Sequence, residues 1–194
     1  MSSVLTFTIR ESFPPRPLRR CASVAGTLLM LVVVAACDSA GNYSGDGTLT
    51  DNGIFSATDR YVLDLGPVAL RNRAEKKYRL ENLPKRSFVL GIEIQPSVKD
   101  FASLERKPID AVVSLSLVAA EGKQVFAVDS KLSAWTWELP STADYAFIYV
   151  RNDPGTYFTP ASDSRYDLTV NILQPDSGSL KYEARLLAKS GGWK

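Results

Sequence analysis

From about residue 61 onward, apolar and polar residues alternate along one short segment after another. A period of two places apolar side chains on one face of an extended strand and polar side chains on the other. The pattern predicts eight or nine strands, taken from residues 61–65, 78–81, 88–94, 113–117, 125–128, 135–139, 145–150, 166–172 and 182–186. Turns rich in Gly, Pro and Asp separate them. This arrangement favours an all-β fold, an antiparallel β-sandwich of jelly-roll-like type.

One connection breaks this rhythm. The segment 96–109 is long for a link between two neighbouring strands. Within it, Val98, Phe101 and Leu104 recur at a spacing of three residues, which predicts a turn or two of helix over 98–106.

The first part of the chain follows a different pattern. Arg10, Arg16, Arg19 and Arg20 precede an apolar run over 22–36, which leads directly into Cys37. As a helix, this run would rise only about 22 Å, which is short of a hydrocarbon core of about 30 Å. The pattern therefore favours an N-terminal targeting segment over a permanent transmembrane helix.

The residues Val34, Ala35, Ala36 and Cys37 resemble the lipobox of bacterial lipoproteins. The resemblance implies that residues 1–36 are a signal peptide, and that the processing enzymes read Val34, Ala35 and Ala36. It also implies that Cys37 carries the lipid that anchors the protein to a membrane, with its domain facing the periplasm. The alternative is an ordinary secretory signal. Asp38 resembles the inner-membrane retention signal of enteric bacteria, but the choice between inner and outer membrane stays open.

Residues 37–54 are rich in Gly, Ser, Asn and Asp and lack apolar periodicity. This composition predicts a flexible tether, long enough when extended to hold the domain about 50 Å from the membrane. The β-sandwich domain is then expected over residues 55–194.

Composition narrows the chemistry of that domain. The segment 1–36 carries four arginines and one glutamate, so the formal charge of +2 for the whole chain becomes −1 from Cys37 onward. This balance gives no reason to expect nucleic acid as a partner. Cys21 leaves with the signal and Cys37 carries lipid, so no disulfide is expected. The chain has no histidine, which removes histidine-based catalysis and histidine-ligated zinc.

Part of the domain resembles bacterial pre-peptidase C-terminal (PPC-like) domains. The segment DAVVSLSLVAAEGKQVFAVDS at 110–130 is similar to the aspartate-led hairpin of that family. YRLENLP at 78–84, the strand at 143–150 and RYDLTVNI at 165–172 are similar to its other strands. The resemblance spans about residues 74–173 and implies a jelly-roll-like accessory or binding module without catalytic activity. The chain departs from the family in its long 96–109 loop, its extra strand after 180 and the lack of an attached peptidase domain.

Aromatic residues supply the candidate binding surface. Tyr145, Phe147 and Tyr149 alternate with core-like residues on one strand, and Tyr157 and Phe158 follow in the next loop. Exposed together, they would form a surface for a protein partner or for sugar rings. The alternative is that another part of the chain covers them. Trp135 and Trp137 are a second candidate ligand platform, with a core-facing pair as the alternative.

Acidic loop residues are a candidate calcium site: Asp144, Asp153, Asp163 and Asp167. They lack a recurring ligand spacing, so no cofactor is predicted. We interpret the chain as a lipid-anchored envelope protein that is not an enzyme and acts as a binding or structural module for a protein partner. The alternative is a carbohydrate-binding module for peptidoglycan or an exported polysaccharide. A third hypothesis is an envelope hydrolase that uses carboxylates.

Overall fold

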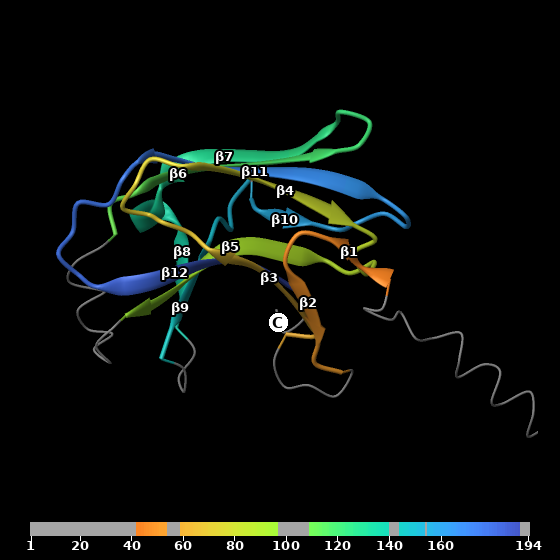
Figure 1. The fold of residues 1–194 in the computed structure, drawn as a ribbon, viewed down its shortest axis with the longest axis horizontal. Coiled ribbons are helices and arrows are strands. Elements are labelled where there is room, and N and C mark those ends of the chain that lie inside the picture. The colour runs from red at the N-terminus through yellow and green to blue at the C-terminus, as the bar shows by residue number, and fades with distance from the viewer. Residues whose placement is uncertain (1–41, 54–58, 97–108, 140–143, 154, 191–194) are drawn as a thin grey trace, which may run out of the picture. The chain divides into compact units, whose positions relative to one another are not determined.

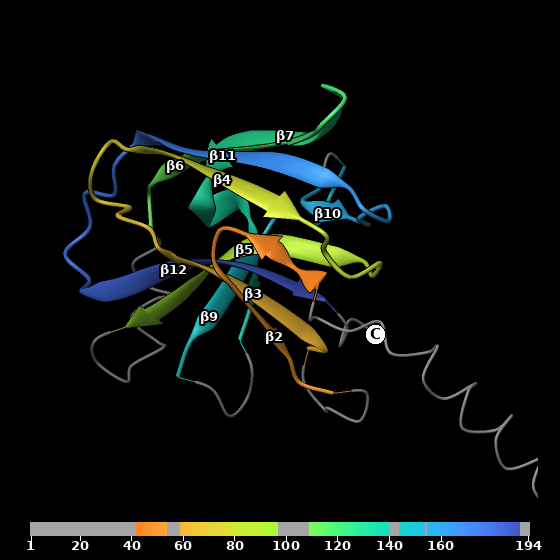
Figure 2. The same cartoon turned by 45° about the vertical axis from the view of Figure 1, so that its right-hand side comes forward.

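The computed structural model describes residues 42–53, 59–96, 109–139, 144–153 and 155–190. Over these residues, the chain forms two antiparallel sheets that pack face to face without closing into a barrel (Figures 1 and 2). The all-β sandwich predicted from the alternating pattern is therefore confirmed.

The described part of the chain contains twelve strands, and the short 3₁₀ turn η2 (Leu132–Ala134) follows β7. The strands are β1 (Ser44–Gly45), β2 (Thr48–Asp51), β3 (Tyr61–Pro67), β4 (Glu75–Glu81), β5 (Phe88–Pro96), β6 (Val112–Ala119), β7 (Gln124–Lys131), β8 (Thr136–Glu138), β9 (Ala146–Tyr149), β10 (Tyr157–Phe158), β11 (Arg165–Gln174) and β12 (Tyr182–Ser190). All nine segments with a predicted period of two are strands. The three further strands are β1, β2 and β10.

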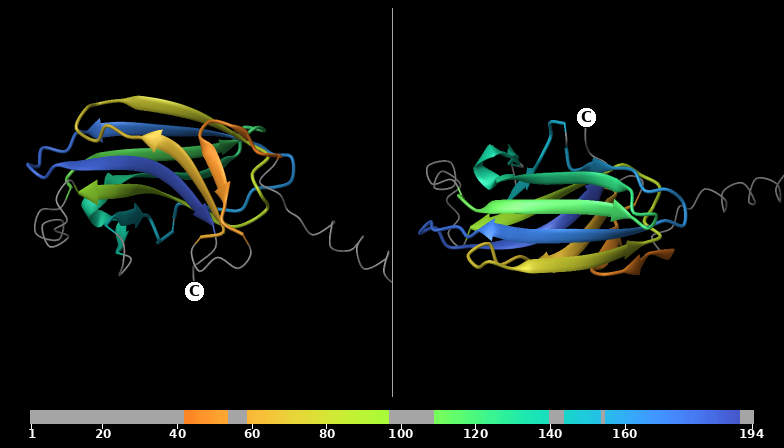
Figure 3. Two further views of the ribbon diagram at one scale, coloured as in Figure 1. Left: turned by 60° about the horizontal axis from the view of Figure 1, so that its bottom comes forward. Right: turned by 90° about the horizontal axis from the view of Figure 1, so that it is seen from above.

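The strands divide into two sheets of unequal width. Sheet A has the order β1-β4-β11-β6-β7, and sheet B has the order β2-β3-β12-β5-β9-β8 with β10 paired to one end of β5. The right-hand view of Figure 3 looks onto sheet A, with β1 in orange at one edge and β7 in green at the other. The two sheets thus share one side that holds β1 and β2, and the opposite side holds β7 and β8.

The core lies between the sheets and follows the alternation in the sequence. In β6, for example, Val113, Leu115 and Leu117 are fully buried, whereas Ser114 and Ser116 between them are half-buried on the outer face. Burying each large apolar side chain contributes about 1.5–3 kcal/mol. Alternation on both sheets fixes which face of each strand points inward, and a slip of one residue would expose the whole apolar set.

The N-terminal residues of the domain are part of the sandwich, so the flexible tether predicted over 37–54 is wrong for residues 44–51. Strand β1 pairs with β4 at the edge of sheet A, and β2 pairs with β3 at the edge of sheet B. The corner between them is Gly45-Asp46-Gly47. Asp46 exchanges two bonds with Arg79: its N–H donates to the Arg79 carbonyl at 2.8 Å, and its carboxylate accepts the Arg79 N–H at 2.7 Å.

The two glycines of this corner are required by close backbone approach. A Cβ at Gly45 would lie 2.4 Å from the Arg79 carbonyl oxygen, and one at Gly47 would lie 2.4 Å from that of Asp64. Gly47 also has a φ of +89°, a conformation that other residues rarely adopt. Glycine here builds a fixed crossover between the sheets, although its abundance suggested flexibility.

Two short strands, β9 and β10, pair with successive parts of the same edge of β5. β9 pairs with Gly91–Ile94, and β10 pairs with Phe88–Val89. Thr156 fills the gap between them: its hydroxyl donates to the Leu90 carbonyl at 2.6 Å, and its carbonyl accepts the Leu90 N–H at 3.0 Å. This buried threonine keeps the backbone ladder continuous, which buried polar groups require.

The connection between β11 and β12 is fixed by a buried carboxylate. Asp176 accepts N–H bonds from Asp110 at 3.1 Å and Gly178 at 3.2 Å, and the Tyr182 hydroxyl donates to it at 2.8 Å. The pKa of Tyr182 is raised, first by burial and second by its hydrogen bond to Asp176. This cluster holds the loops at the end of the sandwich that lies on the left in Figure 1.

Two predictions concern residues outside this description. The helical turn predicted within 98–106 and the signal segment 1–36 both lie outside the described residues. Within the described ranges, no helix has the length and apolar character needed to cross a bilayer.

Candidate functional site

The predicted aromatic surface lies on the outer face of sheet B, but much of it is buried. Ala146 and Ile148 of β9 point into the main core, and Phe147 and Tyr149 point the opposite way, as the alternation predicts. Phe147 is 1% exposed and Tyr149 is 4% exposed. With Val89 and Leu187 they form a second apolar cluster outside the main core. The alternative that this face is covered therefore holds for these two rings.

The second cluster depends on a glycine in the neighbouring strand. Gly91 of β5 stands opposite Tyr149, and the Phe147 ring lies across its backbone. A Cβ at Gly91 would lie 2.6 Å from Cζ of Phe147 and 2.5 Å from the Ile148 carbonyl oxygen. Only glycine leaves room for a phenyl ring at this position.

A lysine completes the cluster. Lys189 of β12 is 5% exposed, and its Nζ lies 4.3 Å from the centre of the Phe147 ring and 4.8 Å from that of Tyr145. The same atom lies 3.3 Å from Glu93 Oε2. The cation is thus held by two ring faces and one carboxylate, which compensates for the loss of water around it. These contacts hold Tyr145 and Phe147 in place, so we interpret the cluster as one that stabilises the fold.

Tyr157 is the exposed member of the aromatic set, with 37% of its surface accessible, and Tyr145 is half-buried. The Tyr157 ring meets Tyr149 edge-on at a centroid distance of 5.9 Å. Burial, together with its hydrogen bond to Tyr157, raises the pKa of Tyr149 to about 12. The Tyr149 phenol is therefore protonated at neutral pH and acts as a neutral hydrogen-bonding group.

Phe158 does not belong to this surface, and its assignment there is wrong. It is 5% exposed and lies in the main core, stacked on Phe88 at 5.8 Å and close to Phe126 and Tyr166. Phe158 of β10 pairs with Phe88 of β5, and this pairing turns the Phe158 side chain inward. The local sequence does not reveal this constraint.

The two tryptophans of the second candidate platform face inward. Trp135 is 5% exposed and donates from Nε1 to Ser130 Oγ at 2.7 Å. Trp137 is half-buried against the core and donates to the Leu132 carbonyl at 3.3 Å. Both indoles thus hold the turn that follows β7, which agrees with the core-facing alternative.

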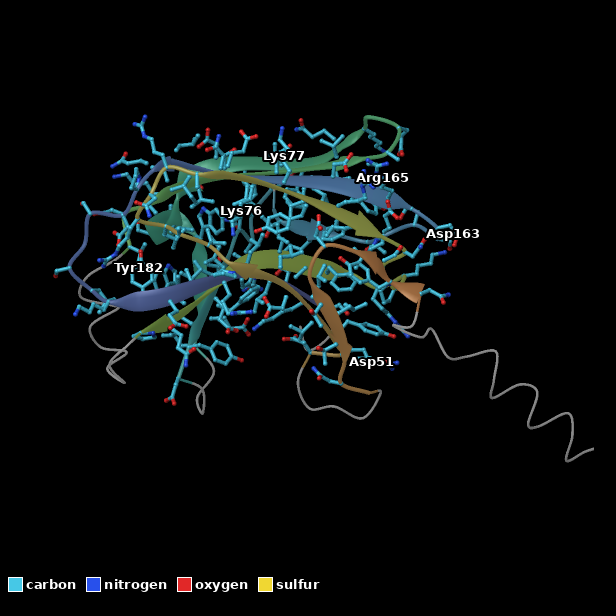
Figure 4. The ribbon with its side chains drawn as sticks, viewed as in Figure 1. Asp51, Lys76, Lys77, Asp163, Arg165 and Tyr182 are labelled. Carbon is cyan, nitrogen blue, oxygen red and sulfur yellow. The ribbon has the colours of Figure 1, made fainter. Side chains whose placement is uncertain are left out.

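The four acidic residues considered for calcium are spread over separate structural elements. Asp163 occupies a turn with a φ of +52° and Asp167 lies on β11, where Arg165 donates to it at 3.4 Å. Figure 4 labels Asp163 and Arg165 at the same end of the sandwich. Asp144 and Asp153 lie in exposed loops on either side of β9. Within the described ranges, no three carboxylates come close enough together to hold a metal ion.

A shallow cleft of about 720 Å³ lies beside the N-terminal corner, on the outer side of β4 and β11. Its charged lining is mixed: Asp46, Lys77, Arg79, Glu81 and Asp167. Arg79 and Arg165 both approach Glu81, at 3.7 and 3.9 Å. These exposed pairs neutralise one another and leave no strong field of one sign for a charged ligand. Sequence reasoning missed this region because its glycine-rich corner suggested a tether.

No protein-family model and no curated protein matches the chain. The residues of the lipobox resemblance, Val34 to Cys37, lie outside the described residues. The functional proposal therefore rests on the sequence of the N-terminal segment and on the geometry of the sandwich.

Proposed function

We propose that this protein is a lipid-anchored, non-catalytic module of a bacterial envelope that binds a protein partner close to the membrane. In this proposal Cys37 carries the lipid after removal of residues 1–36, and the sandwich faces the periplasm. The observation that carries it is the place where the chain enters the sandwich. Strand β1 begins at Ser44, and Asp46 is bonded to β4.

Entry at residue 44 limits how far the domain can lie from its anchor. Seven peptide units separate Cys37 from Ser44, and they span at most about 25 Å at about 3.5 Å each. This reach is about half of that expected for a tether extending to residue 54. A domain held so near its lipid favours a partner that is itself at the membrane surface.

The geometry of the aromatic residues supports a protein partner over a glycan. Stacking on a sugar requires exposed ring faces, whereas Phe147, Tyr149 and Trp135 are all buried. Titration of tryptophan fluorescence with peptidoglycan fragments and exported polysaccharide tests the carbohydrate alternative. We expect a flat titration, and saturable quenching would favour the alternative instead.

The anchor is tested by growing cells with an alkyne-bearing fatty acid and detecting label on the protein. We expect label on the natural chain and none on Cys37→Ser, which keeps the size of the side chain but cannot form the thioether. Label that persists on Cys37→Ser would contradict the assignment of the lipid.

The position near the membrane is tested by lengthening the segment between anchor and domain. A Gly/Ser linker of about twenty residues, inserted after Ala40, gives the domain a much larger reach without altering the sandwich. In-cell lysine-reactive crosslinking, detergent extraction and capture through a C-terminal tag then measure the yield of the partner complex. We expect a yield several-fold lower with the linker, with a shorter insertion of about four residues as control. An unchanged yield would show that the partner does not depend on a short anchor.

A further inference from the structure

The four edge strands of the sandwich differ sharply in length. Strands β1, β2 and β8 have two, four and three residues, whereas β7 has eight. Short edges are a common protection against pairing with other chains. Strand β7 lacks that protection and forms the far edge of sheet A in Figure 3. Of the described edges, it alone offers a long row of backbone groups.

The register of β7 shows which of its backbone groups point away from β6. Lys131 stands opposite Val112, so Leu132 stands opposite Ala111, and the Leu132 N–H donates to the Ala111 carbonyl at 2.9 Å. Hydrogen-bonded pairs alternate along an antiparallel ladder. The residues that bond β6 are therefore 126, 128 and 130. The N–H and C=O groups of Ala127, Asp129 and Lys131 point outward, and within the described residues they have no backbone partner.

The same three residues have exposed side chains, and the strand that carries them is held firmly. Phe126 and Val128 are buried in the core between them. Beyond the end of β7, the Trp135 indole bonds Ser130 and the Trp137 indole bonds the Leu132 carbonyl. An edge fixed in advance loses little conformational freedom when a partner pairs with it.

The two sheets also differ by one strand on this side. Sheet A has five strands in its path, and the path of sheet B from β2 to β8 has six. Strand β8 is the extra one, and its inward-pointing Trp137 is only half-buried against the core. A sixth strand beside β7 would extend sheet A toward this indole.

We propose that β7 accepts an extended segment of the protein partner as a sixth strand of sheet A. This inference rests on the proposed function, because it states how the partner binds. The outward N–H and C=O groups match another extended backbone, which is the basis of strand addition. In an antiparallel pairing, we expect a basic residue of the partner opposite Asp129 and an acidic residue opposite Lys131.

The charges of β7 argue against a second copy of this chain as the occupant. In a two-fold pairing that overlaps the whole strand, Asp129 faces Ala127 and Lys131 faces Val125 of the second copy. The register that pairs Asp129 with Lys131 overlaps only at the end of the strand. A second copy can therefore pair along the whole strand or match the charges of Asp129 and Lys131, but it cannot do both. A different chain can do both.

The test uses the full chain in cells and blocks the outward edge with a single proline. The Ala127 N–H points away from β6, so Ala127→Pro removes a group that the sandwich does not use. Ala127→Ser is the matched control, because it keeps the N–H. A photo-reactive phenylalanine analogue at position 129 measures contact with the partner, and the same analogue at Ser116, on β6 beside Ala127, is the positional control.

We expect crosslinks from position 129 to map to one contiguous segment of another protein, with far fewer from position 116. Ala127→Pro should lower the crosslink yield at least ten-fold at unchanged Tm, and Ala127→Ser should leave it unchanged. Undiminished yield in Ala127→Pro, or crosslinks only to a second copy, would overturn strand addition while the lysine-crosslinked complex still supports the proposed function. No complex with any reagent would overturn both.

Discussion

The two sides of the sandwich differ in how the backbone groups of their edge strands are paired. On the side of β1 and β2, the Gly45-Asp46-Gly47 corner ties both sheets together. The Arg60–Asp51 ion pair at 2.8 Å holds the end of β2, which Figure 4 marks at Asp51. The hydrogen bond from Arg60 lowers the Asp51 pKa below its ordinary value. On the other side, the eight-residue strand β7 is an edge that no described strand covers.

We infer from this contrast that the two sides have different roles. The closed side holds the first described strand of the chain, so under the proposed function it is the side joined to the anchor at Cys37. The open side carries the edge that we propose for the partner. A sandwich that leaves one long edge unprotected risks aggregation unless that edge is used or guarded.

Proline at neighbouring positions of β7 tests which backbone groups are free. Val128→Pro removes a bond to β6 from a buried residue and should lower the free energy of unfolding by more than about 3 kcal/mol. Ala127→Pro should lower it by less than about 1 kcal/mol, because its N–H points outward. Urea unfolding of both variants measures the difference. Equal losses would mean that the assigned alternation along β7 is wrong.

Substituting a glycine of the corner tests how firmly the other side is closed. Gly47→Ala brings a Cβ against the Asp64 carbonyl in a conformation with positive φ, and should cost about 2–4 kcal/mol. Gly53→Ala is the control: its φ is +84°, but none of the described residues lies within 4 Å of its Cβ position. The control should lose only about 1 kcal/mol from backbone strain. If the two losses are equal in thermal unfolding, close approach contributes nothing to the corner.

Substituting Asp46 tests the hydrogen bond between its carboxylate and the Arg79 N–H of β4. Asp46→Ala leaves the Arg79 N–H without its acceptor and should cost about 1–2 kcal/mol. Asp46→Asn keeps an acceptor oxygen and should recover most of this loss. Chemical denaturation of the three proteins decides the point, and an Asn variant as weak as the Ala variant would assign the effect to charge.

A smaller effect involves pH. Burial raises the pKa of Asp59, whose carbonyl accepts a bond from Asn52 at the closed side. Folding therefore favours the protonated carboxyl, so stability is greatest below the ordinary Asp pKa near 4 and falls as pH rises through the raised value. Asp59→Asn should raise the Tm slightly at pH 7 and not at pH 3, with exposed Asp153→Asn as control. A gain that is the same at both pH values would contradict this sign.

The sequence predicted the strands with a clear period of two, because alternation reports burial on one face. It also predicted that Phe147 and Tyr149 point away from Ala146 and Ile148. It gave a covered face and an exposed face as alternatives and could not decide between them, because the choice depends on contacts between distant segments such as Gly91 and Lys189. Phe158 was assigned to the wrong face because β10 takes its orientation from β5.

The N-terminal corner was the largest miss of the sequence interpretation. Glycine-rich composition is typical of flexible linkers, but glycine also permits the closest approach of two backbones. Only the positions of Arg79 and Asp64 distinguish these roles, and both lie outside the local sequence. Thr48, Leu49 and Thr50 after the corner carry a short alternating pattern that was the available signal.

Residue-resolved amide hydrogen exchange on the protein purified in detergent is the first measurement to make on the contrast between the two sides. We expect slow exchange at Asp46 and Arg79, whose amides are bonded across the corner. We also expect fast exchange at Ala127 and Asp129 and slow exchange at Val128 between them. Fast exchange at Asp46, or protection of Ala127 and Asp129 in the unbound protein, would contradict this contrast.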